Sequence, residues 1–219
     1  MKTKAKIFLV DDHPLVREWL THLIHQQPDL MVCGEAESAP QAFDAILKMR
    51  PDIAIVDISL KSGSGIELLK NIRAAAPEVA MIVLSMHDES LYAERALRAG
   101  ARGYIMKRET AKRVIAAIRQ VLQGKLYLSE SMRVHFAEKF EGGDPPATSL
   151  PVQQLSDREL EVFQLLGQGY ETRQIAASLN ISMKTVQAFC ARIKEKLSLA
   201  SATELLREAV RWHDNQQVR

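Results

Sequence analysis

Hydrophobic residues in the first 125 positions fall into five short runs, and each run is followed by a longer stretch with helical spacing. The runs occupy residues 7–10, 31–33, 53–56, 81–84 and 103–106. Short runs that are apolar throughout, rather than alternating with polar residues, are typical of strands buried on both faces of a parallel sheet. The pattern therefore predicts a (βα)5 unit, an α/β domain whose five-stranded parallel sheet is covered by helices on both sides.

The remaining residues follow a different pattern. Glycine, proline and small polar residues dominate 141–151, which indicates a linker, and a short amphipathic helix is predicted just before it, over 129–140. Helical spacing then returns over residues 157–168, 172–179, 183–197 and 202–212. The break at 180–182 has the length expected in a helix-turn-helix. The predicted organisation is an α/β domain over 1–125, a linker with room for a short helix over 126–152, and an all-α domain over 153–219.

Composition narrows the class of protein. The chain has 219 residues, 47% of them hydrophobic, and 29 Lys and Arg against 27 Asp and Glu. The run at 7–10 is far shorter than the roughly 7 to 15 apolar residues of a signal peptide, and no run approaches the roughly 18 that cross a bilayer. Two distant cysteines, Cys33 and Cys190, fit a reducing compartment. We therefore expect a cytoplasmic protein without a membrane partner.

Acidic residues stand where two predicted strands end. Asp11 and Asp12 follow the first run, and Asp57 follows the third. In a flavodoxin-like strand order these ends are neighbours, and ligands bind beyond the carboxyl ends of the strands. Three carboxylates at one point repel one another unless a cation or a proton neutralises them. A divalent cation that prefers oxygen ligands, such as Mg2+, is therefore the expected partner.

A hydroxyl and an amine complete this pattern. Ser85 ends the fourth run, and Lys107 follows the fifth. An aspartate can accept a phosphoryl group when a metal ion and a cation take up charge on the phosphoryl oxygens. Taken singly, such residues are ordinary helix caps, turn residues and surface charges. Their joint placement at strand ends favours a phospho-accepting site centred on Asp57.

The first 125 residues resemble a two-component receiver domain, on the segments LVDDHP, IAIVDISL, VLSMHD and GARGYIMKRE. The resemblance implies phosphorylation of Asp57 by a sensor histidine kinase. It also implies that Mg2+ is held by Asp12, Asp57 and the main-chain carbonyl of Ser59, with Asp11 in support.

The resemblance also implies a conformational change on phosphorylation. Ser85 would turn toward the phosphoryl group while Tyr104 moves inward, which would reshape the face formed by the fourth helix, the fifth strand and the fifth helix. The alternative for Tyr104 is an ordinary half-buried aromatic residue of a strand.

Two positions depart from the receiver pattern. Lys61 and Arg108 stand where many receivers have proline, and the sequence leaves the cis or trans state of the Lys107–Arg108 bond open. Ser59 and His87 occupy the positions that in this family tune hydrolysis of the phosphoryl group. His87 either positions water or lies in solvent, and both alternatives stay open.

The predicted helix at 183–197 has two different faces. Val186, Cys190, Ile193 and Leu197 form a narrow apolar stripe, as a core face requires. The opposite face carries Lys184, Gln187, Ala188, Ala191 and Glu195, with Arg192 beside it. Small and basic residues on an exposed helix suit the major groove of DNA. The alternative is a solvated face on a small protein-binding domain.

Residues 155–212 resemble a LuxR-type four-helix DNA-binding domain, on LSDRELEV, IAASLNIS, the TV pair and IKEKL. With a receiver in front, the chain resembles a NarL/FixJ-family response regulator. The resemblance implies DNA contacts from Thr172, Arg173, Lys184, Thr185, Gln187, Ala188, Ala191, Arg192 and Lys196, with Thr172, Arg173, Arg192 and Lys196 on phosphates. It implies dimer contacts from Leu205, Leu206 and Ala209 of the last helix.

The sequence departs from this family where specificity is set, because Gln187 replaces a common lysine and Phe189 a common histidine. Glutamine can contact adenine in bidentate fashion, so we expect readout to shift toward adenine.

The predicted function is that of a bacterial response regulator. Phosphorylation of Asp57 controls dimerisation and binding to paired half-sites on double-stranded DNA, and the protein is not an enzyme with an external substrate. The alternatives are a regulator that works without phosphorylation and a Mg2+-dependent phosphohydrolase with Asp57 as nucleophile. The phosphohydrolase lacks an evident general acid and leaves the helical domain without a role.

Overall fold

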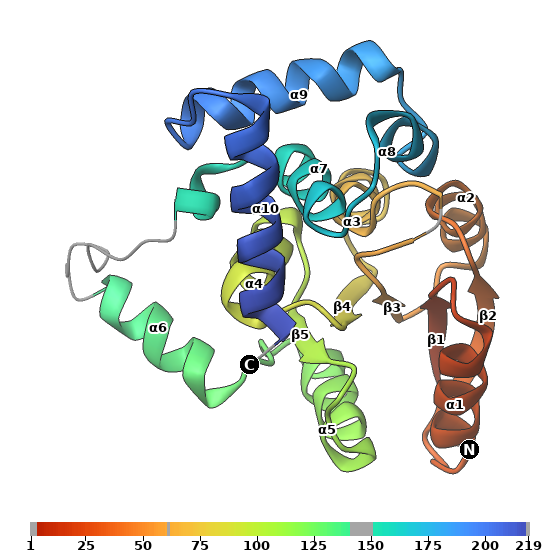
Figure 1. The fold of residues 1–219 in the computed structure, drawn as a ribbon. Helices are drawn as coiled ribbons and strands as arrows, with labels where there is room; N and C mark the ends of the chain where they lie inside the picture. The colour runs from red at the N-terminus through yellow and green to blue at the C-terminus, as the bar shows by residue number, and fades with distance from the viewer. Residues whose placement is uncertain (1–3, 61, 141–150, 218–219) are drawn as a thin grey trace. The chain divides into compact units, whose positions relative to one another are not determined.

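The structure is a computed structural model that describes residues 4–60, 62–140 and 151–217 (Figure 1). Within it the chain divides into two compact units, Met1–Glu138 and Lys139–Arg219. Each unit has its own hydrophobic core. The first is an α/β domain and the second is helical, as the sequence predicts.

The first unit contains a parallel five-stranded sheet in the order β2-β1-β3-β4-β5. Its strands are β1 (Ala5–Val10), β2 (Leu30–Ala36), β3 (Ile53–Val56), β4 (Ala80–Ser85) and β5 (Gly103–Met106). The helices between and after them are α1 (Pro14–His25), α2 (Ala39–Met49), α3 (Gly65–Ala75), α4 (Glu89–Ala99) and α5 (Ala111–Leu122). This is the predicted flavodoxin-like (βα)5 fold.

Burial explains why the central runs are apolar throughout. Every residue of β3 and β5 is buried, because helices cover both faces of the sheet. One face packs Ile7 and Leu9 against Leu20 of α1 and Ile118 of α5. The edge strand β2 leaves Met31 partly exposed and is less uniformly buried.

The strand order also places the acidic residues. Val10 of β1 is paired with Val56 of β3, so Asp11 and Asp57 follow side by side at the carboxyl edge of the sheet. The Asp57 amide donates to the Val10 carbonyl at 2.8 Å, which extends the ladder by one residue. The adjacency of β1 and β3 therefore assembles the predicted cluster.

The first unit extends beyond the predicted limit at residue 125. Tyr127 forms a parallel bridge with Gly103 of β5, and α6 (Glu130–Phe140) begins directly after it. The hydroxyls of Ser129 and Ser131 both donate to Glu89 Oε1, at 2.7 Å for Ser129, and Met132 is buried. These contacts attach the segment that follows α5 to the first unit, which ends at Glu138.

Replacing both Ser129 and Ser131 by alanine is expected to loosen this attachment. Each lost hydrogen bond costs about 0.5 to 1.5 kcal/mol, so amide exchange in the first turns of α6 should accelerate severalfold. Hydrogen exchange measured by mass spectrometry checks this. Ser90→Ala, which affects a hydroxyl bonded to Asp88 at 2.6 Å, is the control. Unchanged exchange in α6 of the double variant would show that Glu89 does not hold the helix.

The second unit contains a short 3-10 turn, η1 (Pro151–Gln154), followed by α7 (Asp157–Gly167), α8 (Thr172–Ser178), α9 (Met183–Lys196) and α10 (Ala202–Gln217). The four predicted helices are confirmed to within one residue at most ends. The exception is α10, which continues past 212 through polar residues that carry no hydrophobic period.

Local signals explain the ends of these helices. Ser156 and Glu159 form the capping box that begins α7, and the Ser182 side chain accepts from the Thr185 amide at the start of α9. Asn180, in the turn between α8 and α9, has a φ of 52°, a left-handed conformation that asparagine tolerates better than most residues. The side chains of Phe163, Val186, Ile193 and Trp212 pack into the core that these helices enclose.

Candidate functional site

Three buried carboxylates converge at the carboxyl edge of the sheet. Asp11, Asp12 and Asp57 are 2%, 7% and 3% exposed, and one ligand atom from each lies within 4.8 Å of the others and of a ring nitrogen of His13. Buried charges of one sign are unstable without compensation. The structure thus brings together the three aspartates that the sequence singled out.

Lys107 compensates part of this charge. Its Nζ lies 2.7 Å from Asp57 Oδ2 and 2.7 Å from Asp11 Oδ2. Burial raises the pKa of Asp57, although Lys107 opposes this rise. Burial also tends to lower the pKa of Lys107, but the charges of Asp57 and Asp11 outweigh it and the pKa is raised. Three carboxylates against one ammonium leave an excess of negative charge, which a divalent cation would balance.

Asp12 gives an independent sign of a cation position. Its Oδ1 is buried and has no hydrogen-bond donor among the described residues. His13 Nδ1 lies 2.8 Å from this oxygen and 3.1 Å from Asp11 Oδ1. Buried polar atoms without a partner call for an explanation, and an ion is one of the ordinary ones. The donor set of carboxylate oxygens fits Mg2+.

The hydroxyl predicted at the end of β4 lies deep in the fold. Ser85 is fully buried, and its Oγ accepts from the His87 amide at 3.3 Å. Tyr104 of β5 is also buried, and its hydroxyl donates to the His87 carbonyl at 2.8 Å. The two residues predicted to form the switch thus both contact the backbone of His87, and both are buried.

The His87 ring is held by protein groups. Its Nε2 lies 2.5 Å from Ser59 Oγ, and its centroid lies 4.7 Å from that of Tyr92. The Ser59 amide also donates to Asp57 Oδ1, at 3.3 Å. His87 is only partly buried, so both alternatives for its role, positioning water or lying at the solvent-exposed surface, stay predictions.

We expect the imidazole of His87 to be neutral at pH 7. Burial, together with the charge of Lys107, lowers its pKa to about 4. The chemical shift of the His87 Hε1 proton, followed by NMR, should therefore change near pH 4 and stay constant between pH 6 and 8. A titration midpoint near the ordinary histidine value of about 6.5 would contradict the burial seen here.

The two departures from the receiver pattern have different outcomes. The described residues contain no cis peptide bond, so the bond between Lys107 and Arg108 is trans. Lys61 lies outside the described residues.

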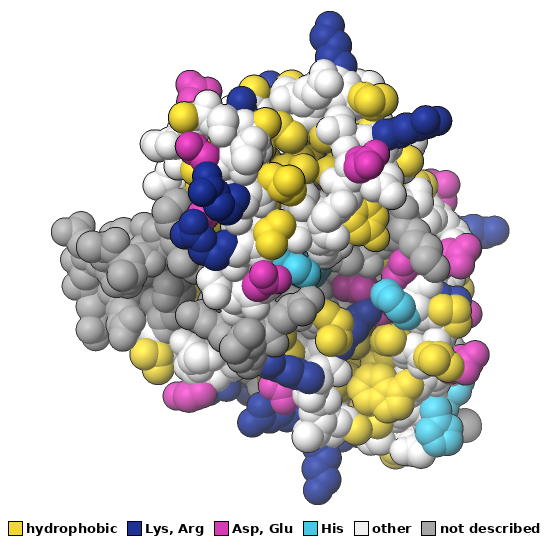
Figure 2. Space-filling view, viewed as in Figure 1, with side chains coloured by type: hydrophobic (Ala, Val, Ile, Leu, Met, Phe, Trp, Pro, Cys, Tyr) yellow, Lys and Arg dark blue, Asp and Glu magenta, His cyan; other side chains and the backbone are white. Residues whose placement is uncertain are grey.

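In the helical unit, α9 presents the expected exposed face. Val186 and Ile193 are buried in the core, while Cys190 and Leu197 are only partly buried. The predicted base and backbone contacts on this helix are all exposed: Lys184, Thr185, Gln187, Ala188, Ala191 and Arg192. At the start of α8, Arg173 is exposed and Thr172 is partly buried. Figure 2 shows Lys and Arg side chains projecting from the region of α9.

Lys196, a predicted phosphate contact, also forms an ion pair within the helical unit. Its Nζ lies 2.6 Å from Glu159 Oε2 and also donates to the Gln154 carbonyl at 3.3 Å. Burial raises the pKa of Glu159, but the hydrogen bonds from Lys196 and Ser156 outweigh it and lower the pKa. Because the Glu159 side chain is only 3% exposed, the Lys196 ammonium is engaged as its partner. The Lys196 side chain is nevertheless 39% exposed, so its contact with phosphate stays a prediction beside the ion pair.

Two of the three predicted dimer contacts are corrected by burial. Leu205 is 3% exposed and Ala209 is fully buried, because both face the core of the helical unit. Leu206, the third, is 46% exposed, and Val210, which the sequence analysis did not select, is 37% exposed. Both lie on the outer face of α10, four residues apart.

Both units of the chain match known protein families. Residues 7–119 match the response regulator receiver domain, and residues 153–209 match the bacterial regulatory proteins of the luxR family. The oxygen regulatory protein NreC of Staphylococcus carnosus is 34% identical over 210 residues, covering 94% of this chain and 97% of NreC. NreC of Staphylococcus epidermidis is 35% identical over 211 residues, with the same coverage.

Solved structures of response regulators are also similar to this chain. A LuxR-family two-component response regulator from an Aurantimonas species is 34% identical, with a TM-score of 0.59, and covers 64% of this chain and 99% of its own. RcsB from Salmonella enterica serovar Typhimurium, bound to promoter rprA with the phosphomimetic BeF3-, is 25% identical, with a TM-score of 0.67 over 94% of this chain and 98% of its own. The described helices of this chain include none long and apolar enough to cross a membrane. By its two domain matches and its full-length relatives, the chain belongs to the NarL/FixJ family of two-component response regulators, transcription regulators in which a receiver precedes a LuxR-type DNA-binding domain.

Proposed function

We propose that a sensor histidine kinase phosphorylates Asp57 and that this step controls dimerisation and DNA binding. The observation that carries the proposal is the position of Lys107, which bridges Asp57 and Asp11 beside Asp12, whose Oδ1 has no hydrogen bond among the described residues. An Asp57 oxygen would form the new bond to phosphorus as the bond to the donor breaks. Lys107 would then move its charge from the carboxylate to a phosphoryl oxygen.

Asp11, Asp12 and Asp57 are the side chains that would hold Mg2+, together with the main-chain carbonyl of Ser59. When bound, Mg2+ would neutralise charge on the phosphoryl oxygens. Ser85 is proposed to donate to the same group, and its present contact with the His87 amide shows what would have to rearrange.

The exposed face of α9 supports the proposed DNA contact. It combines small residues, which allow close approach, with Lys184 and Arg192, which attract phosphate. We infer that two copies bind paired half-sites and that Leu206 and Val210 of α10 contribute to the dimer. Since the proposed target is bacterial chromosomal DNA, the cytoplasm is the proposed compartment.

The full chain incubated with acetyl phosphate and Mg2+ is expected to gain the mass of one phosphoryl group and to bind a selected operator more tightly. Asp57→Asn should gain no mass and show no enhancement, because the amide is not a comparable nucleophile. Asp44→Asn, on the exposed surface of α2, is the control. An unmodified wild type, or modification that persists in Asp57→Asn, would refute the mechanism in favour of a regulator that works without phosphorylation.

A separate expectation concerns sequence readout. If Gln187 contacts adenine, Gln187→Ala should cost about 1 to 3 kcal/mol of binding at one base pair and relax the preference there. Affinities for operators substituted at each position measure this. The idea is wrong if the operator has no adenine dependence and Gln187→Ala leaves affinity and selectivity unchanged.

A further inference from the structure

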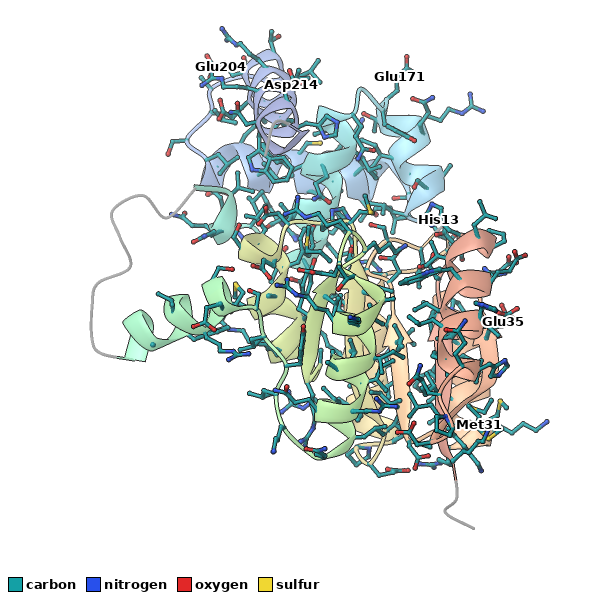
Figure 3. The ribbon with its side chains drawn as sticks, turned by 90° about the horizontal axis from the view of Figure 1, so that it is seen from below. His13, Met31, Glu35, Glu171, Glu204 and Asp214 are labelled. Carbon is teal, nitrogen blue, oxygen red and sulfur yellow. The ribbon has the colours of Figure 1, made fainter. Side chains whose placement is uncertain are left out.

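Arg17, in the first turns of α1, makes a contact with the acidic site that no sequence motif indicated. Its Nη1 donates to the main-chain carbonyl of Asp11 at 2.7 Å. The Arg17 side chain is only 14% exposed, and its Nε lies 3.5 Å from Glu35 Oε2 at the end of β2. Figure 3 shows Glu35 beside α1 and His13 at the start of that helix.

The carbonyl that Arg17 holds belongs to the peptide between Asp11 and Asp12. This peptide is a rigid plane, so the direction of its carbonyl sets the backbone of both residues on either side. The Asp11 amide is fixed from the other side by the Ala36 carbonyl at 3.1 Å. A charged donor makes a stronger hydrogen bond than a neutral one. The two bonds together leave little freedom for the loop that presents the Asp11 and Asp12 carboxylates.

We propose that Arg17 is a positioning residue of the metal site: it holds the Asp11–Asp12 peptide so that both carboxylates face the cation. The inference rests on the proposed function, because it requires that these aspartates bind Mg2+. Arg17 contacts the main-chain carbonyl of Asp11 and the Glu35 carboxylate, so it would act on the metal ligands through the backbone. Its pairing with Glu35 offsets its charge, so that the guanidinium adds little repulsion to the site.

If Arg17 acted on the site only through its charge, its removal would change the affinity for Mg2+ in the opposite direction. A guanidinium near a cation site repels the cation, so its removal should tighten Mg2+ binding if charge alone matters. Loss of a residue that orients metal ligands instead weakens binding, typically by about 10- to 100-fold. The direction of the change therefore separates the two roles.

The test is calorimetric titration of the full chain with MgCl2, without any phosphoryl donor. Arg17→Met, which keeps the length of the apolar stem, is expected to raise the dissociation constant for Mg2+ by about 10-fold or more. Arg17→Lys keeps the charge and one donor, so it should fall between wild type and Arg17→Met. Glu35→Gln is the matched control, because it removes the charge partner and leaves the bond to the Asp11 carbonyl; its affinity should stay within about twofold of wild type, since Glu35 is half exposed.

Circular dichroism without Mg2+ establishes that each variant is folded. If Arg17→Met does not fold, Arg17→Lys decides the question: weaker binding than wild type supports positioning, and equal binding overturns it. Binding by Arg17→Met that equals or exceeds that of wild type also overturns it. A wild type that does not bind Mg2+ would instead refute the proposed metal site, and the role of Arg17 with it.

Discussion

Lys107→Met is expected to abolish phosphoryl acceptance and to destabilise the first unit by about 3 to 5 kcal/mol at pH 7. The reason is that the variant leaves Asp11 and Asp57 buried without the ammonium that now contacts both at 2.7 Å. Removing one partner of a buried ion pair costs this much because the remaining charge stays desolvated. Amide exchange of the strand residues in β1 and β3 measures the free energy of opening of this unit separately from that of the helical unit.

The dependence of this effect on pH has a definite sign. Burial already raises the pKa of Asp57, and loss of Lys107 should raise it further. A carboxyl with a raised folded pKa is destabilising when ionised, and the penalty disappears as pH falls and the group is protonated. The loss of stability in Lys107→Met, relative to wild type, should therefore be smaller at pH 5 than at pH 8.

Magnesium should partly replace the missing charge. It is expected to stabilise Lys107→Met more than wild type, because stabilisation by a ligand at a given concentration grows as its dissociation constant falls, and the variant site carries one more uncompensated negative charge to attract the cation. Lys112→Met, on the exposed surface of α5, is the control. A Lys107→Met variant as stable as Lys112→Met would show that the aspartates do not need the lysine.

Lys196→Met is expected to destabilise the helical unit by about 1 to 2 kcal/mol, less than Lys107→Met destabilises the first unit, because the Lys196 side chain is 39% exposed. Its partner Glu159 is 2% exposed and would be left ionised inside the fold. The double variant Glu159→Gln with Lys196→Met should recover most of the loss, because glutamine can still accept from the Ser156 amide, which bonds Glu159 Oε2 at 2.7 Å. Amide exchange of α7 and α9 measures the change, and Lys194→Met is the control.

The ion pair between Lys196 and Glu159 should depend on pH in the opposite direction to the Asp57 site. The hydrogen bonds from Lys196 and Ser156 lower the pKa of Glu159 in the folded state. The stabilisation that ionised Glu159 provides is therefore fully present above the ordinary pKa of glutamate, and it is lost as the pH falls through the lowered pKa. Wild type and Lys196→Met should therefore converge in stability at low pH. In DNA binding, the salt slope of folded Lys196→Met tests the predicted phosphate contact: a slope reduced by about 1 supports the contact, and a slope equal to that of wild type contradicts it.

The amino-acid order by itself determined the elements and the acidic cluster. Short apolar runs and helical periods are local, so the five strands and most helix ends of the second unit could be predicted from them. The cluster could also be predicted, because residues that directly follow parallel strands meet at one edge of the sheet once the strand order is known. The exposed face of α9 followed from helical spacing alone.

Only the tertiary structure decided which partner each side chain has. Leu205 and Ala209 look like surface candidates in sequence, but the packing of α10 turns them into the core. Lys196 pairs with Glu159, 37 residues away, and Arg17 reaches the Asp11 carbonyl because α1 folds back over the end of β1. Such pairs depend on how separate elements pack in three dimensions. The pattern of polar and apolar residues along the chain does not specify this packing.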